Sequence, residues 1–323
     1  MKAEAFLADL EVKPAALRAL ARVIADEKWP VVPGGRLLLT GMGSSWFAAD
    51  TIARRLRRAG VQAVGELASV EASYPADPSL TVVAITASGT SKETLQILAA
   101  HRGISPTIVL TNKPPTATPL ADHTMLMHAG EELGGVACRS YTHTLATLLQ
   151  LEHQLTGGVP DLPKKIELAA DAAAALLDTR NTWLPAVRAA LAGPHGCWLL
   201  APAERMASAL QGALMFREGP RLPADGCETG DWNHVDVYLT KSLDYRALLF
   251  AGGRFDADAV QWMRERRSRF VVVGGHVRGA EFEVRYQGDD DPIVALLTEV
   301  LIAELVAADS WLHPLTQRPA TKR

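Results

Sequence analysis

The sequence lacks the features that mark several common classes of protein. Only three of its 323 residues are cysteine, and they are far apart with no CxxC pair: Cys138, Cys197 and Cys227. A disulfide framework or a zinc site is therefore not expected. No stretch approaches 18 uninterrupted apolar residues, so no transmembrane helix is expected. The opening residues carry acidic side chains and no long apolar run, so we expect no secretory signal and a cytoplasmic protein.

An excess of charge of one sign is also missing. The chain has 33 Lys and Arg against 36 Asp and Glu, a formal charge of −3, and no basic block, so we do not expect it to bind nucleic acid. Apolar residues make up 48% and charged residues 21%, as in an ordinary globular protein. This composition excludes disorder for most of the chain. The length suggests two domains or one large α/β unit.

The glycine motifs of nucleotide-binding loops are absent as well. No GK(S/T) occurs, and Gly41-Met42-Gly43 opens like a dinucleotide loop but has Trp46 where the third glycine would stand. No group of His, Asp and Glu has the spacing of metal ligands. We therefore expect neither a cofactor nor a metal.

What the sequence does contain is an alternation of short apolar runs with helical patterns. This alternation predicts an α/β fold with parallel sheets and helices on both faces. In the first half we expect helices at 1–28, 48–58, 92–101 and 139–155, and strands at 36–40, 63–67, 81–85, 107–111 and 124–127. In the second half we expect helices at 165–178, 207–217, 256–267 and 292–309, and strands at 197–200, 247–250 and 270–273.

One stretch is the best candidate for a boundary between two domains. Residues 156–163 contain two glycines and two prolines, which cannot continue a helix. We therefore place the first domain at 1–160 and the second at 161–323.

The most informative loop follows the predicted strand 81–85. It reads Thr86-Ala87-Ser88-Gly89-Thr90-Ser91, directly before a predicted helix. A helix N-terminus carries unpaired N–H groups and a partial positive charge, and therefore binds phosphate. Gly89 allows close backbone approach, and the hydroxyls add donors. The alternative is an ordinary serine N-cap with incidental neighbours.

A second loop with hydroxyl groups follows the predicted strand 36–40. It contains Ser44 and Ser45 after Gly41-Met42-Gly43. In open α/β sheets, ligands bind at the carboxyl ends of the strands. We expect the two loops to lie side by side there.

The sequence resembles the sugar isomerase (SIS) domain family at five motifs. The 40–45 segment is similar to G-x-G-S/T-S, and 84–94 to S-x-S-G-x-S/T-x-D/E-T. Further on, 129–142 resembles AGxExGVAxTKxFT, 209–218 resembles ALEGALKLKE, and 228–234 resembles AAGELKH. The motifs cover about residues 35–310 in the family's order. The resemblance implies two tandem SIS subdomains, each a flavodoxin-like sandwich, as in the isomerase half of glucosamine-6-phosphate synthase.

The resemblance also implies an active site for aldose–ketose chemistry on a phosphosugar. Glu218 matches the family's glutamate for proton transfer between C1 and C2. His234 matches the histidine that helps to open the sugar ring, which the neighbouring subunit supplies. Val136 and Ala137 are possible substrate contacts. The sugar phosphate would bind to residues of the two loops: Ser44, Ser45, Thr86, Ser88, Gly89, Thr90 and Ser91.

Each of these residues also has a plainer interpretation. Glu218, before Gly219-Pro220, is alternatively a surface glutamate, and His234 a loop histidine with a structural partner. Asp236 is a further candidate that would orient His234 or contact an amine. It is equally well explained as a polar residue of a strand face.

The sequence departs from the synthases in several places. Ala87 replaces a glutamine, Met215 replaces a lysine, and the tail has no lysine in register for an imine, Lys322 being the nearest. The chain is too short for a glutaminase domain, so we do not expect glutamine-dependent amidotransfer. The second half has no copy of the hydroxyl loop, only residues 250–253 without hydroxyls. We therefore expect one sugar-phosphate site per chain.

These observations favour an enzyme of carbohydrate metabolism over two alternatives. The first prediction is a phosphosugar isomerase or an amino-sugar-6-phosphate deaminase acting on a hexose 6-phosphate, with a sugar phosphate–amine deglycase as a close relative. The second is a non-catalytic sugar-phosphate sensor, although only about 35 residues precede the first strand, too few for a helix-turn-helix module. The third, a nucleotide-binding protein, lacks the glycine motifs. The resemblance further implies a homodimer with shared active sites.

Overall fold

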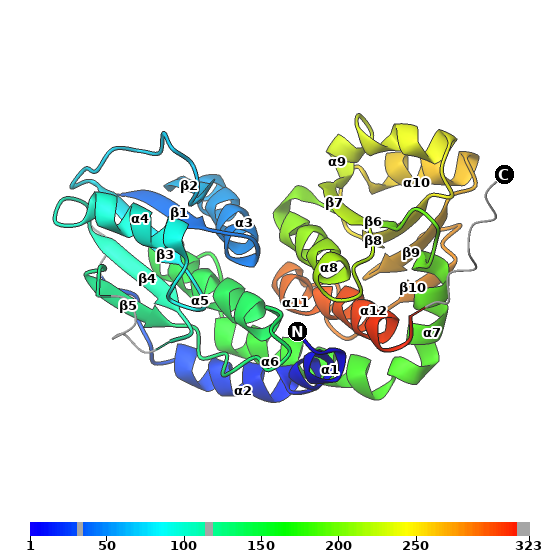
Figure 1. Ribbon diagram of the computed structural model, residues 1–323, viewed down its shortest axis with the longest axis horizontal. Helices are drawn as coiled ribbons and strands as arrows, with labels where there is room; N and C mark the ends of the chain where they lie inside the picture. Colours follow the sequence, from blue (N-terminus) through cyan, green and yellow to red (C-terminus); the bar gives the residue numbers. More distant parts are fainter. Residues whose placement is uncertain (31–34, 114–118, 315–323) are drawn as a thin grey trace.

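Two parallel five-stranded sheets, each wrapped by helices, form the chain (Figure 1). The computed structural model describes residues 1–30, 35–113 and 119–314, so the C-terminal tail with Lys322 lies outside the described residues. Within these ranges no helix combines the length and hydropathy that a membrane span requires.

The first sheet is built from the five apolar runs predicted in the first half. Its strands are β1 (Arg36–Gly41), β2 (Gln62–Leu67), β3 (Leu80–Ile85), β4 (Thr107–Thr111) and β5 (His123–Leu126). All pairs are parallel, in the order β2-β1-β3-β4-β5. This is the flavodoxin-like order, in which the chain reverses its direction of strand addition between β1 and β3.

Helices cover both faces of this sheet, so its central strands are buried on both sides. Leu37 and Leu39 of β1 pack into the cluster formed with α3 (Ser44–Arg58) and α5 (Arg139–Thr156). Leu38, which points the opposite way, packs against Ile97 of α4 (Lys92–His101). Continuous apolar runs are what such doubly covered strands need.

The second sheet repeats the arrangement of the first. It contains β6 (Cys197–Ala201), β7 (Ala224–Glu228), β8 (Arg246–Phe250), β9 (Arg269–Val273) and β10 (Phe282–Val284), in the order β7-β6-β8-β9-β10. Numbered within its own half, this is again 2-1-3-4-5. One face packs on α8 (Met206–Glu218) and α12 (Val300–Leu312), and the other on α10 (Asp256–Glu265). The predicted fold class is confirmed.

Four further helices pack between the two halves: α1 (Ala3–Glu11), α2 (Lys13–Ile24), α6 (Leu162–Asp178) and α11 (Pro292–Thr298). Helix α7 (Arg180–Leu191) packs on the second sheet beside α12. Helix α2 packs on α6, α6 packs on α11, and α1 packs on α12. A buried ion pair of 2.5 Å joins Lys13 Nζ to Glu304 Oε2 across this layer. The boundary at residue 160 stays a prediction, and the helices beside it pack across it.

Several predicted elements need correction. The helix predicted at 1–28 is two helices that meet at Val12, because Pro14 lies at the start of α2. The final predicted helix, 292–309, is divided at Glu299. Helix α3 begins at Ser44 rather than at residue 48. Six elements were not predicted: α7, β7, β10, η2 (Ala203–Arg205), α9 (Thr229–Trp232) and η3 (Asp236–Lys241).

Candidate active site

The two hydroxyl loops lie at the carboxyl ends of neighbouring strands. Strands β1 and β3 pair directly, with Thr40 opposite Ala84. Ser44 and Ser45 therefore begin α3 at the same edge of the sheet where residues 86–91 begin their turn. A Cβ on Gly41 would lie 2.7 Å from the Cβ of Ser45 and 3.0 Å from the Ile85 carbonyl oxygen. The first loop is thus packed closely against the end of β3.

The loop after β3 presents its central hydroxyls to solvent. Ser88 and Thr90 are exposed, whereas Thr86 is only 4% exposed. The Ser88 and Thr90 hydroxyl oxygens lie 2.9 Å apart, and the Thr90 backbone N–H donates to Ser88 Oγ at 3.2 Å. Gly89 has φ 71°, a conformation that glycine adopts without strain. Ser88 and Thr90 are therefore the hydroxyls of this loop most accessible to a ligand.

The hydroxyl of Ser91 is already engaged at the start of α4. Its Oγ donates to Glu93 Oε2 at 2.9 Å and accepts from Thr94 Oγ1 at 3.1 Å. The N–H of Glu93 itself and the Ser91 hydroxyl hold the pKa of the Glu93 carboxyl below its usual value. A phosphate that used the Ser91 hydroxyl would have to take it from this carboxylate.

Glu218 is the last residue of α8 and is half-buried. Its carboxylate accepts no hydrogen bond from any described residue. Burial raises the pKa of Glu218, while the positive charges of Arg221 and Arg217 lower it by smaller amounts. A carboxylate with a raised pKa and free lone pairs is suited to accept and return a proton.

Arg217 and Arg221 are functional candidates that the sequence analysis missed. Arg221 has φ 61°, in the left-handed region that L residues rarely adopt. The turn is fixed by hydrogen bonds from the Gly219 N–H to Met215 O and from the Leu222 N–H to Phe216 O. The positive charges of both arginines are near enough to lower the pKa of Glu218. Their spacing from Glu218, one residue before and three after, was the only available signal.

The segment before α5 lies against α8, some distance along the helix from Glu218. The Ala137 carbonyl accepts from Gln211 Nε2 at 2.7 Å. Gln211 and Glu218 are seven residues apart, so they lie two turns apart on one face of α8. The Val136 side chain is 2% exposed and packs in the core, which leaves only its backbone for a ligand.

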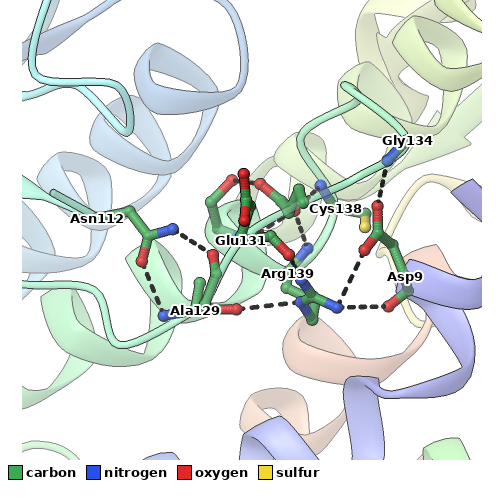
Figure 2. A network of polar contacts seen from close by, with 10 residues as sticks. Asp9, Asn112, Ala129, Glu131, Gly134, Cys138 and Arg139 are labelled. Carbon is green, nitrogen blue, oxygen red and sulfur yellow. Dashed lines mark hydrogen bonds and ion pairs between the residues drawn. The ribbon is translucent and has the colours of Figure 1, made fainter. Parts of the chain in front are cut away.

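A polar network fixes this segment in place (Figure 2). The Arg139 guanidinium pairs with Asp9 at 3.2 Å and donates from Nε to the Ala129 carbonyl at 3.0 Å. Asp9 Oδ2 also accepts from the Gly134 N–H at 2.7 Å, and Asn112 Oδ1 accepts from the Ala129 N–H at 2.9 Å. The network joins α1, the end of β4 and the start of α5, and so ties down the chain on both sides of residues 136 and 137.

His234 lies elsewhere, on the outer side of the second half. It is exposed and lines a cavity of about 690 Å³, and the described residues that line this cavity all lie between 228 and 262. The other lining residues are Glu228, Gly230, Asp231, Asn233, Phe255, Asp258, Gln261 and Trp262. Neither Glu218 nor a residue of the hydroxyl loops lines this cavity.

Asp236 forms its contact with a thiol rather than with His234. The half-buried carboxyl is hydrogen-bonded to Cys227. Burial raises the pKa of Asp236, the Cys227 hydrogen bond lowers it, and the neighbouring charges of Asp225 and Asp231 raise it further. Among the described residues no hydrogen bond joins Asp236 to His234.

These positions do not bring all the predicted residues together. The hydroxyl loops meet at the edge of the first sheet, and α3, which begins with Ser44 and Ser45, packs against α8. Among the described residues no hydrogen bond or ion pair joins Glu218, at the end of α8, to either loop. His234 and Asp236 belong to the surface around α9 and η3. Within the described ranges no group of three or more His, Cys, Asp and Glu is arranged to hold a metal.

Comparisons with known proteins agree with this architecture. Residues 33–153 match the SIS domain family. A glutamine–fructose-6-phosphate aminotransferase (isomerizing) from Pyrococcus horikoshii is 27% identical over 222 residues, which cover 63% of this chain and 36% of that relative. The chain thus spans much less than two thirds of that protein.

Two solved structures share the fold across nearly the whole chain. The C-terminal domain of glucosamine-fructose-6-phosphate aminotransferase from Francisella tularensis has a TM-score of 0.80 at 16% identity, covering 94% of this chain and 95% of that one. Tagatose-6-phosphate ketose/aldose isomerase from Escherichia coli has a TM-score of 0.78 at 15% identity, covering 96% and 92%. At these identities the likeness concerns the fold.

Proposed function

The chain is a SIS-domain protein, homologous to the isomerase domain of glutamine–fructose-6-phosphate aminotransferases and to phosphosugar isomerases and deaminases, and we propose that it is an enzyme acting on a hexose 6-phosphate. The reaction is a proton transfer between C1 and C2 of the sugar. It ends either in aldose–ketose isomerisation or, for an amino sugar, in a C2 imine that water hydrolyses to the ketose and ammonia. The observation that carries the proposal is the meeting of two hydroxyl-bearing loops at the switch point of the first sheet.

In the proposed mechanism the phosphate anchors the substrate. Ser88 and Thr90 offer exposed hydroxyls, Ser44 and Ser45 lie on the adjacent loop, and the N-termini of α3 and α4 favour a negative charge. A phosphate held away from the reacting carbons supplies binding energy that positions them. This arrangement needs neither a metal nor a cofactor.

Glu218 is the proposed base and acid of the transfer. In isomerisation it takes the proton from C2 of the open-chain aldose, which leaves an enediolate with its charge on O1. A proton passes from O2 to O1, and Glu218 returns its proton to C1 to give the ketose. The raised pKa of Glu218 brings the carboxyl closer to neutrality, where one group both accepts and donates efficiently. Two turns away on the same face of α8, the fully buried Gln211 holds the Ala137 carbonyl and so fixes the neighbouring segment against the helix.

His234 is proposed to assist ring opening from a second copy of the chain. Its exposed position in a cavity whose described lining residues all lie between 228 and 262 supports a role across an interface. An imidazole that donates and accepts near neutral pH suits this step. The proposal therefore includes a homodimer with shared sites.

The test is a thermal-shift screen combined with assays for ketose and ammonia. Fructose 6-phosphate, glucose 6-phosphate and glucosamine 6-phosphate are the first ligands, because a ligand of the folded state raises the melting temperature. Ketose without ammonia identifies an isomerase, and ammonia identifies a deaminase. Stabilisation without turnover would instead favour the sensor, and no stabilisation by any hexose phosphate would refute the phosphate site.

Two variants separate binding from catalysis. Ser88→Ala should weaken sugar-phosphate binding, with Thr182→Ala, an exposed hydroxyl on α7, as its control. Glu218→Gln should abolish solvent proton exchange at C2 while binding is retained, with the exposed Glu167→Gln on α6 as its control. Lost binding in Glu218→Gln would give that residue a structural role.

A further inference from the structure

The second half has a loop in the same topological position as the hydroxyl loop of the first half. Strands β6 and β8 pair directly, with Leu200 opposite Leu249, and they form the switch point of the second sheet just as β1 and β3 do in the first. The chain leaves β8 through residues 251–255 and enters α10 at Asp256 (Figure 1). In the first half the equivalent turn is the loop at residues 86–91.

This turn already holds a negatively charged group. The backbone N–H groups of Gly252 and Gly253 each donate to Asp256 Oδ2 at 2.8 Å. Asp256 is 9% exposed. Burial raises the pKa of Asp256, and the Gly253 and Gly252 N–H groups and the charge of Arg205 lower it by smaller amounts. One carboxylate oxygen, Oδ2, thus accepts both N–H groups, as an oxygen of a bound oxyanion would.

Arg205 lies beside the 251–255 turn and comes from η2, which follows the neighbouring strand β6. It follows β6, is 7% exposed, and donates to the carbonyl oxygen of Ala251 as well as pairing with Glu299 at 2.6 Å. A Cβ on Gly252 would lie 3.1 Å from its Nη2. A buried guanidinium thus lies directly beside the two donating N–H groups.

The backbone of the turn is shaped for close approach of an oxyanion. Gly252 has φ 117°, which only glycine adopts readily. A Cβ on Gly253 would lie 2.5 Å from Asp256 Oδ1, so a side chain there would displace the carboxylate. Successive N–H groups that converge on one oxygen before a helix are a common way for proteins to bind phosphate.

We propose that the second half retains the anion-binding turn of the fold and that the carboxylate of Asp256 occupies it as a built-in ligand. The site is closed to external oxyanions in the native protein and opens to inorganic phosphate when that carboxylate is removed. The proposal explains in physical terms why the second half needs no hydroxyls in this turn. It does not depend on the proposed catalytic activity.

The test uses Asp256→Ala with inorganic phosphate as the probe. Because the first-half loops also attract phosphate, the comparison is made in a Ser88→Ala background. The melting temperature of each variant is measured at high phosphate and in potassium chloride of equal ionic strength. For Ser88→Ala/Asp256→Ala, the melting temperature should be at least about 2 °C higher in phosphate than in potassium chloride, and for Ser88→Ala alone the difference should be smaller. Asp258→Ala is the matched control, because it removes a carboxylate from the same helix turn that accepts neither glycine N–H.

Each outcome decides the question. A folded Asp256→Ala protein whose phosphate response equals that of its background would overturn the proposal. If Asp256→Ala fails to fold, Asp256→Ser leaves both N–H groups in place and is tested in its stead. Folding that is rescued only by phosphate supports a vacated anion site. Failure of both variants to fold even in phosphate would show that Asp256 is needed for another reason and would refute the built-in-ligand role.

Discussion

Replacing Gly41 by alanine tests whether the two hydroxyl loops act as one binding site. The new Cβ would lie 2.7 Å from the Cβ of Ser45, where ordinary contact begins at about 3.4 Å, and 3.0 Å from the Ile85 carbonyl. The start of α3 must therefore move about 0.7 Å away from the end of β3. Such overpacking costs about 1–3 kcal/mol of folding stability.

The effect on ligand binding follows from the same displacement. A hydrogen bond of about 2.8 Å that lengthens by about 0.7 Å is essentially lost. Hydrogen bonds to a charged group contribute about 1.5–3 kcal/mol, so the loss of the Ser45 contact to phosphate should weaken binding roughly tenfold to hundredfold. The assay is titration calorimetry with the best sugar phosphate from the screen, together with urea unfolding.

The matched control is Gly275→Ala in the second half. Its Cβ would also lie 2.7 Å from another Cβ, that of Ala251, so its stability cost should be similar. Its sugar-phosphate affinity should remain that of the unmodified protein. A folded Gly41→Ala protein with unchanged affinity would refute the view that Ser45 and the 86–91 loop hold one phosphate.

Three further predictions follow. Of the two arginines that lower the pKa of Glu218, Arg221 has the larger effect. Arg221→Met should therefore move the acid limb of the kcat/KM–pH profile to higher pH, and Arg217→Met should move it less. An unmoved limb contradicts the assignment of Glu218 as the base. Lys13→Met leaves Glu304 buried without its partner and should cost about 3–5 kcal/mol in urea unfolding, whereas Lys13→Met/Glu304→Leu should recover most of this loss; no recovery would count against the ion pair as the cause. His143 is 1% exposed, and burial lowers its pKa to about 4. The free energy of unfolding should therefore fall by about 3 kcal/mol as pH drops from about 6.5 to 4. His143→Gln should lose less stability over this range, and an equal loss in the variant would refute the role of His143.

The sequence predicted most of the fold because the central strands are buried on both faces. Such strands appear as continuous apolar runs, as in β4, whose predicted bounds match the structure. The edge strands β2 and β5 of the first sheet were also predicted, but the two edge strands of the second sheet carry no such signal. β7 reads Ala-Asp-Gly-Cys-Glu and pairs on one side only, and β10 has three residues. Both were missed for this reason.

The candidate site was predictable where function depends on loops that directly follow strands. Ser88 and Thr90 were placed correctly after β3 because a buried strand and a helix start flank them. The environment of Glu218 was not predictable in the same way. The influence of Arg221 depends on a left-handed backbone at the end of α8, and the Ala137 contact depends on packing between residues 74 positions apart.

Asp256 shows why two related turns can have different chemistry without a clear sign in the sequence. Aspartate is common in the first turn of a helix, because the partial positive charge of the helix N-terminus stabilises its carboxylate. In the sequence, Asp256 therefore suggests nothing beyond the start of a helix. Only the folded turn reveals that its carboxylate reaches back to Gly252 and Gly253. In the first half, the corresponding turn has hydroxyls on Ser88 and Thr90 that face solvent. The corresponding turns thus differ in what they present: in the second half two backbone N–H groups bind a carboxylate of the protein, and in the first half two hydroxyls face solvent.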